Sequence, residues 1–371
     1  MTTIEKFADM PQACENIDAE PVPGGIILSR RGHSNGRRVL FVNSYGGPNL
    51  WREIREGLAP THHLWGCIEL LARGYTVLVS EPIKHFSIRG RILPHDLKYH
   101  RHLADWLRRD DILFSAHTLL YWIPLLHQLG YRRRVIVSLT YAREQLDFPR
   151  AHRGVIALTP AAADEARRVA PHAKVAMLGW GVDLGFYPVL PYNPKFFLSC
   201  GRTERDFGTL ARGVGLSGHV TSIVSAKDAP GVVWPTNAKR VGTGGPGDSV
   251  PFSELVHHYY AHCTASIIAL NADPREKTAV GFTAAIEAMA MARPVIVTHT
   301  GAMPGVLDLV KRRCGIAIPV GDAQALADAM RVLHDDPATA AEMGVTGRQH
   351  CEEFFNINRY ASDLDAYFQS L

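Results

Sequence analysis

Short runs of apolar, mostly β-branched residues recur along the first half of the chain, separated by stretches with helical spacing. Such runs are typical of buried strands, and their alternation with helices predicts a parallel sheet covered on both faces. The strands predicted in this half are 38–43, 76–79, 112–115, 135–138, 155–158 and 175–178. Thr159 is expected to cap the following helix, with Pro160 at its first position. Residues 1–36, where Pro, Gly and polar residues dominate, give no clear prediction.

A second set of strands begins after residues 179–194, where Gly, Pro and Asn indicate an interdomain linker. These strands are 195–200, 220–224, 265–269, 294–297 and 315–320, and helices are expected from 323 onward. The pattern predicts two consecutive α/β domains, 1–185 and 186–371, with the C-terminal helix packing back on the first. In such folds the ligand site lies at the carboxyl ends of the strands, here in a cleft between the domains.

Residues 280–298 are the most informative segment, because they predict a turn, a helix and a buried strand. Gly281 and Thr283 open the helix, and Pro294 stops it. A helix start offers backbone N–H groups without helical partners and the positive end of a dipole, which suits a diphosphate. Glu287 follows about one turn later, where its carboxylate could accept hydrogen bonds from ribose hydroxyls. An ordinary α/β helix would tolerate the same residues, so the segment alone leaves both interpretations open.

The composition is ordinary for a soluble globular protein, with 46% hydrophobic and 20% charged residues. A length of 371 residues suits two domains. The six cysteines are scattered without a CxxC pair, so the sequence predicts neither a zinc site nor a disulfide framework, and it fits a reducing cytoplasm. The most apolar stretch, 119–129, is too short to span a bilayer, and the N-terminus is not of the secretory type.

The net charge of +4 is unevenly distributed, with a basic first half and a slightly acidic second half. Clusters of arginine mark the basic half at 30–31, 37–38, 108–109 and 132–134. Such a surface could meet an anionic acceptor or the acidic inner face of a membrane, which would make the protein peripheral there. The alternative is a solvated face with no partner, which is the usual outcome for runs of charge.

Several short motifs occur in order from about residue 154. They are Gly181-Val182-Asp183, the strand ending in Gly201-Arg202, the segment 250–255, Glu287-Ala288-Met289-Ala290, and Gly321-Asp322. Together they resemble the glycosyltransferase group 1 family of retaining enzymes with the GT-B fold. The resemblance covers over half the chain and implies two Rossmann-like parallel-sheet domains facing a central cleft. It implies transfer of a sugar from a UDP- or GDP-sugar co-substrate to a hydroxyl acceptor, which could be a glycan, a lipid-linked sugar or a small molecule.

The resemblance also implies that the first domain binds the acceptor and the second binds the donor. It implies a metal-independent enzyme with no bound cofactor and no nucleic-acid partner. Its catalytic residues would be His117, Arg202 and Arg205. Breaking the anomeric bond places negative charge on the leaving diphosphate, and an arginine is always charged and can grip two oxygens. A neutral imidazole at His117 could hydrogen-bond a sugar hydroxyl.

The donor-binding residues implied by the resemblance are Gly47, Glu276, Gly281, Phe282, Thr283 and Glu287. The family commonly has a second glutamate eight positions before Glu287, where this chain has Ala279, and Glu276 is the nearest acid. Gly47 closes a turn where small residues let the backbone approach a phosphate. Arg205 follows Arg202 at a shorter spacing than is usual in the family, so its role is the more open of the two.

Acceptor binding is expected at His62, His63 and Arg143. The two histidines follow a long insertion after the first strand and suggest an acceptor loop, and the alternative is buried or capping histidines beside a core tryptophan. Arg143 follows the fourth strand and could face the cleft.

Two rival functions fit the same fold. A sugar-nucleotide epimerase would need acid/base carboxylates, for which Glu144 and Glu276 are candidates. A non-catalytic nucleotide- or sugar-binding protein is favoured by Ala279. Residues 242–247 match GxGxxG, but prolines delay the next helix, which disfavours a dinucleotide site. Residues 363–365 match the DxD metal motif but lie in a predicted amphipathic helix, where solvated acids are expected.

Overall fold

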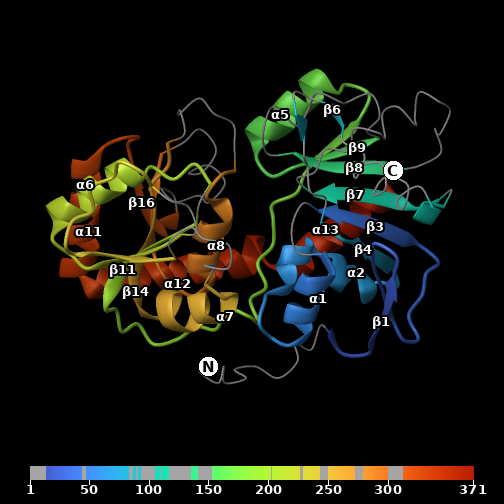
Figure 1. Cartoon of the computed structure of the whole chain (residues 1–371), viewed down its shortest axis with the longest axis horizontal. Coiled ribbons are helices and arrows are strands. Elements are labelled where there is room, and N and C mark those ends of the chain that lie inside the picture. The colour runs from blue at the N-terminus through green and yellow to red at the C-terminus, as the bar shows by residue number, and fades with distance from the viewer. Residues whose placement is uncertain are drawn as a thin grey trace. The chain divides into compact units, whose positions relative to one another are not determined.

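The computed structural model in Figure 1 divides the chain into two compact units. Unit 1 comprises Met1–Gly181 and Ile357–Leu371, and unit 2 comprises Val182–Asn356. The division falls a few residues before the expected boundary at 185, and the C-terminal segment belongs to unit 1. The structure describes residues 14–43, 47–82, 87–88, 91–92, 105–108, 110–116, 135–140, 153–201, 203–225, 229–242, 250–271, 279–299 and 312–371.

Unit 1 is built on an eight-stranded sheet of order β1-β2-β4-β3-β7-β8-β9-β10. The strands from β4 to β10 are parallel, and β2 pairs antiparallel with both β1 and β4. The bounds are β1 Ile17–Val22, β2 Gly25–Arg30, β3 Arg38–Asn43, β4 Thr76–Ser80, β7 Ile112–Ala116, β8 Val135–Thr140, β9 Gly154–Ala157 and β10 Lys174–Met177. A separate pair joins β5 Ser87–Ile88 and β6 Arg91–Ile92. The six strands predicted for this half are confirmed.

The hairpin of β1 and β2 has no counterpart in the predicted elements. β1 is an edge strand whose side chains are exposed or only half-buried, so its sequence carries no apolar run. It includes Pro21, which an edge strand tolerates because one side of the strand needs no partner. The hairpin extends the parallel sheet by antiparallel pairing of β2 with β4.

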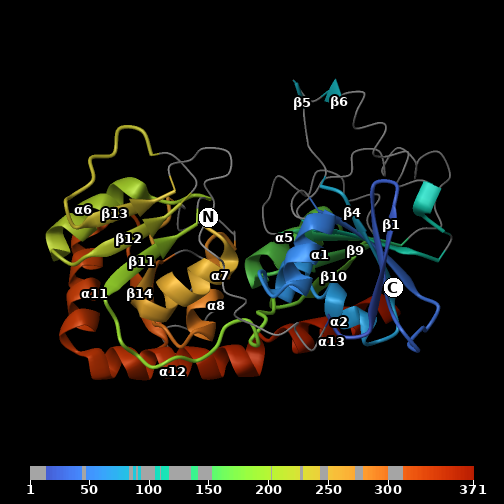
Figure 2. The same cartoon turned by 60° about the horizontal axis from the view of Figure 1, so that its bottom comes forward.

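The helices of unit 1 are short, apart from α5 and α13. They are α1 Gly47–Arg55, η2 Thr61–Leu64, α2 Cys67–Leu71, α5 Pro160–Val169 and α13 Ile357–Gln369. The predicted cap of α5 is confirmed, since Thr159 Oγ1 accepts a hydrogen bond from the Ala162 N–H at 3.1 Å. Figure 2 shows α13 beside α2, as the contacts between the two helices also indicate.

The C-terminal helix α13 packs against the body of unit 1 through polar and aromatic contacts. The Tyr75 hydroxyl donates to Asp365 Oδ1 at 2.7 Å, and the ring of Phe368 meets Phe114 edge-on at 5.7 Å. Asp363 is paired with Arg359 on the same helix. The two acids of the DxD match are therefore engaged by neighbours within unit 1.

Unit 2 is built on a parallel six-stranded sheet of order β13-β12-β11-β14-β15-β16. The bounds are β11 Phe196–Cys200, β12 Thr221–Val224, β13 Ala238–Val241, β14 Cys263–Ile268, β15 Val295–Thr298 and β16 Gly315–Ile318. Counted along unit 2, the order is that of a Rossmann-type doubly wound sheet. Five of these strands match the prediction. The sixth, β13, is an edge strand of sequence Ala-Lys-Arg-Val, which lacks an apolar run.

The helices of unit 2 pack on this sheet and on one another. They are α6 Phe207–Ser217, α7 Phe252–Glu254, η5 Leu255–Tyr259, η6 Tyr260–His262, α8 Phe282–Ala290, α11 Ala323–Asp335 and α12 Pro337–Phe354. Aspartates at 206, 322 and 336 cap α6, α11 and α12, and each accepts a hydrogen bond from an N–H of the first turn. No helix in the described parts of the chain is long and apolar enough to cross a membrane.

At Gly344, helix α12 packs closely against the turn between α8 and β15. A Cβ at this position would overlap the carbonyl oxygen of Ala292, which is backbone and cannot move aside. We expect Gly344→Ala to lower the free energy of unfolding by about 1–3 kcal/mol in urea titrations, although alanine favours a helix interior by about 1 kcal/mol.

The matched control is Gly215→Ala in α6, where the new Cβ would lie 3.5 Å from Pro235, an ordinary contact. This variant should be unchanged or more stable, by up to about 1 kcal/mol. A Gly344→Ala protein as stable as Gly215→Ala would contradict the packing described for α12.

Candidate nucleotide-binding site in unit 2

The site lies where the strand order of unit 2 reverses. β11 and β14 are neighbours in the sheet, but the chain leaves β11 toward β12 on one side and β14 toward β15 on the other. In doubly wound sheets, ligands bind at the carboxyl ends of the strands at this switch point. Here these ends are Cys200 in β11 and Ile268 in β14. The described residues after them, 201, 203–206 and 269–271, together with the start of α8, form the candidate site.

The loop after β11 is held against the end of β14 by backbone hydrogen bonds. The Asp206 N–H donates to Ala269 O at 3.0 Å, and the Asn271 N–H donates to Glu204 O at 3.0 Å. Arg205 and Leu270 form an isolated antiparallel bridge between the two segments. The backbone around Arg205 is therefore fixed from both sides.

The Arg205 guanidinium is turned into its own loop. Its Nε and Nη2 donate to Cys200 O at 3.2 and 3.0 Å, and its Nη1 donates to Thr203 O at 2.9 Å. The residue is only 6% exposed, and burial lowers the pKa of the guanidinium. A Cβ at Gly201 would overlap Nη2, so a glycine at 201 makes room for this arrangement.

The guanidinium is thus engaged within its own loop, and the expected role of Arg205 at a leaving diphosphate stays a prediction. Every nitrogen of its guanidinium is bonded to a backbone carbonyl, so Arg205 braces the loop. The short spacing after Arg202 was the sequence signal for this orientation. Arg202, the other expected cation, lies outside the described residues, as do His117, Arg143 and Glu276.

The start of α8 has the features expected of an anion-binding helix end. Gly281 precedes the helix with φ +83°, a left-handed conformation that favours glycine, and a Cβ there would lie 2.7 Å from Ile268 Cγ2. Gly281 offers no side chain to cap the helix. The N–H groups of Thr283 and Ala284 lie in the first turn, where the helix itself supplies no acceptor.

Phe282 differs from the other residues of this turn. Its N–H donates to Ala279 O at 3.0 Å, and its ring is buried and meets Phe355 edge-on at 5.5 Å. The side chain of Phe282 is thus part of the core, and its expected part in donor binding stays a prediction. Thr283 is half-buried and remains the polar side chain at the helix start.

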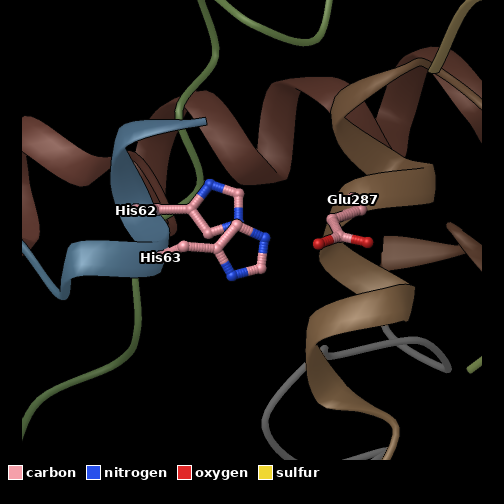
Figure 3. Close-up of side chains that lie close together, drawn as sticks. All are labelled: His62, His63 and Glu287. Atoms are coloured by element: carbon pink, nitrogen blue, oxygen red, sulfur yellow. The ribbon is translucent and has the colours of Figure 1, made fainter. Parts of the chain in front are cut away.

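Glu287 lies on α8 (Figure 3), four residues after Thr283 and so on the same face of the helix. The residue is 5% exposed, and its Oε2 accepts a hydrogen bond from the Tyr260 hydroxyl at 3.2 Å. The Tyr187 hydroxyl also hydrogen-bonds Glu287. Burial raises the pKa of both tyrosines well above the usual value, and the nearby Glu287 adds to this rise. Both hydroxyls are therefore protonated donors at neutral pH.

Cys200 extends this buried group to the end of β11. Its Sγ lies 2.9 Å from the Tyr260 hydroxyl, and burial, with a further contribution from Glu287, raises the pKa of the thiol to about 11. Cys200 is therefore a neutral thiol under ordinary conditions. No motif in the sequence predicts a role for Cys200, Tyr187 or Tyr260. Tyr260 follows the family-like segment 250–255 closely, but nothing in a sequence shows which strand or helix its hydroxyl meets.

In unit 1, the expected site residues are packed against the chain itself. His62 is fully buried, its ring lies 4.6 Å from that of His63 (Figure 3), and it meets Trp180 edge-on at 5.3 Å. Trp180 in turn stacks on Trp65 at 4.6 Å. His62 and His63 therefore belong to a buried aromatic cluster, which is the alternative to an exposed acceptor loop. A Cβ at Gly47 would lie 2.7 Å from Ser80 O, so the close approach there is to β4.

Comparison with known proteins agrees with this architecture. Residues 247–336 match the family model of glycosyl transferases group 1. A sucrose-phosphate synthase from Thermosynechococcus elongatus is similar in structure, with a TM-score of 0.63 and 17% identity over 90% of this chain and 98% of its own. An α,α-trehalose-phosphate synthase (UDP-forming) from Burkholderia vietnamiensis gives 0.62 and 12% over 91% and 100%. HepE from Anabaena, in complex with UDP-glucose, gives 0.61 and 15% over 90% and 100%.

No curated protein matches the sequence. The similar solved structures share few residues with this chain, so they establish the fold alone. The segment that matches the family model contains α8. The expected GT-B fold with two Rossmann-like domains is confirmed. The chain therefore has the GT-B fold, and its residues 247–336 match the family model of glycosyl transferases group 1.

Proposed function

We propose that the protein is a retaining glycosyltransferase that transfers a sugar from a UDP- or GDP-sugar to a hydroxyl group of a glycan, a lipid-linked sugar or a small molecule. The observation that carries the proposal is the start of α8, with Glu287 one turn inside it, at the switch point of the unit 2 sheet. The family match spans this segment, and the similar HepE structure is a complex with UDP-glucose. Unit 2 would bind the donor, and unit 1 would select the acceptor.

The chemistry follows from the charges that develop during transfer. The leaving diphosphate gains negative charge, which the first-turn N–H groups at Thr283 and the helix dipole would stabilise. Arg202 would add a full positive charge there. Glu287 would accept hydrogen bonds from the ribose, and His117 would contact the donor sugar. In this scheme Arg205 acts indirectly, by bracing the loop that carries Arg202.

The proposed location is the cytoplasm, with unit 1 able to contact the inner face of a membrane through its arginines. Local pairing limits the charge available for such a contact. Arg31 pairs with Asp18 at 2.8 Å, and Arg38 with Asp111 at 3.5 Å. Any attraction to an acidic surface would therefore be moderate and sensitive to salt.

A second candidate function is a non-catalytic protein that binds a nucleotide or nucleotide sugar. The inward orientation of Arg205 favours it, because one of the two expected diphosphate cations is already bonded to backbone carbonyls. Such a protein would bind a nucleoside diphosphate without consuming its sugar. Incubation with the donor and a panel of acceptors, followed by detection of the released nucleoside diphosphate, separates the two functions.

Nucleotide binding is the first consequence of the proposal. A ligand that binds only the folded protein raises the melting temperature. We expect one of UDP, GDP, ADP, dTDP or CDP at millimolar concentration to raise the melting temperature by several degrees, and the corresponding nucleoside to have a smaller effect because it lacks the diphosphate. Absence of any shift across the panel would contradict the proposal.

Glu287→Gln tests the ribose contact. The amide keeps the size of the side chain but loses the charge that strengthens hydrogen bonds from hydroxyls. We expect roughly a tenfold rise in the Kd of the best nucleotide, measured by calorimetry. The control is Glu342→Gln on the exposed side of α12, which should leave the Kd unchanged. Equal Kd values for both variants would remove Glu287 from the site.

Metal independence is tested with the same binding measurement. The proposed diphosphate contacts are N–H groups and Arg202, so the Kd should change by less than about twofold when EDTA replaces magnesium or manganese in the buffer. Binding that disappears in EDTA and returns with one of these ions would show that a metal holds the diphosphate.

A further inference from the structure

A π-helical turn lies directly before Tyr260, whose hydroxyl donates a hydrogen bond to Glu287. Residues Leu255–Tyr259 form η5, and the N–H of Tyr260 donates to both Leu255 O and Val256 O at its end. π-helical turns are rare and often occur at functional sites. The extra residue in the turn changes the direction in which the next side chain leaves the helix. Tyr260 is fully buried here, with its hydroxyl directed to α8.

Three polar neighbours of the Tyr260 hydroxyl lie among the described residues of unit 2. They are Glu287 Oε2 at 3.2 Å, Cys200 Sγ at 2.9 Å and Ala284 O at 3.4 Å. A tyrosine has one proton to donate, and a carboxylate is a stronger acceptor than a thiol or an amide carbonyl. The consistent assignment is that the Cys200 thiol donates to Tyr260 and Tyr260 donates to Glu287.

This chain of bonds fixes the orientation of the Glu287 carboxylate. A glutamate side chain has several rotatable bonds, and holding it in one conformation before a ligand arrives removes an entropic penalty from binding. The hydroxyls of Tyr187 and Tyr260 both bond this carboxylate, and both come from segments outside α8. The orientation of Glu287 therefore depends on tertiary structure and not on its helix alone.

We propose that Tyr260 is a positioning residue that holds the Glu287 carboxylate in the orientation that receives the ribose hydroxyls of the donor nucleotide. Cys200, the last residue of β11, supports the Tyr260 hydroxyl and so links the loop at Gly201 to the ribose contact. The inference rests on the proposed function of unit 2 as the donor-binding unit.

The test compares Tyr260→Phe with Tyr192→Phe. Tyr192 is a matched control, because its hydroxyl also donates a partly buried hydrogen bond in unit 2, to Thr264 O at 2.9 Å. Calorimetry would give the Kd of the best ribonucleoside diphosphate and of its 2′-deoxy and 3′-deoxy forms. We expect Tyr260→Phe to weaken binding of the ribonucleotide about tenfold and to leave the Kd of the deoxy form that lacks the contacted hydroxyl nearly unchanged. Tyr192→Phe should change neither Kd.

A double variant separates positioning from general destabilisation. If Tyr260 acts through Glu287, Tyr260→Phe combined with Glu287→Gln should bind no more weakly than Glu287→Gln alone. Losses that multiply, or a Tyr260→Phe variant that weakens ribo- and deoxynucleotides equally, would overturn the inference. If Tyr260→Phe fails to fold, Cys200→Ala replaces it, with an expected loss of about two- to threefold in ribose discrimination, and unchanged discrimination would overturn the inference.

Failure of the proposed function gives a different result from failure of this inference. A wild-type protein that binds no nucleoside diphosphate overturns both. A wild-type protein that binds one with a preference for the ribose, while Tyr260→Phe retains the full preference, overturns the role of Tyr260 only.

Discussion

A buried carboxylate must be hydrogen-bonded, and this requirement at Glu287 organises the candidate site of unit 2. Removing an unpaired charge from water is so unfavourable that the fold must supply donors for it. Among the described residues of unit 2, two tyrosine hydroxyls act as such donors, one from the segment before β11 and one that follows the π-helical turn η5. Tyr260 also contacts Cys200, so these hydrogen bonds connect Glu287 to the carboxyl end of β11. The switch point of the sheet and the first turns of α8 are thus joined by one buried polar network.

Arg205 satisfies the corresponding requirement for a buried cation, and it does so with backbone carbonyls. The consequence for function is a division of roles within the loop after β11. A buried arginine makes the loop rigid, and a different group has to face the diphosphate. The proposed mechanism assigns the stabilisation of the diphosphate charge to the first-turn N–H groups of α8 and to Arg202.

The fold could be predicted from the sequence because strands buried on both faces carry continuous apolar runs. The strands β3, β4 and β15 were predicted almost residue for residue, and so was the Thr159 cap. The edge strands β1 and β13 were missed because an exposed edge needs no apolar run. The site was predicted less completely. Motif spacing locates Gly281 and Glu287, but the direction of the Arg205 guanidinium and the partners of Tyr260 depend on contacts between segments far apart in the chain.

The central claim is that the start of α8 binds the diphosphate of a nucleotide while Glu287 binds its ribose. A crystal structure of the protein with the nucleoside diphosphate that stabilises it most tests this claim directly. The account predicts phosphate oxygens within hydrogen-bond distance, roughly 3 Å, of the N–H groups of Thr283 and Ala284, and a ribose hydroxyl at a similar distance from a Glu287 carboxylate oxygen. A nucleotide bound elsewhere, or bound here with its ribose away from Glu287, would contradict it.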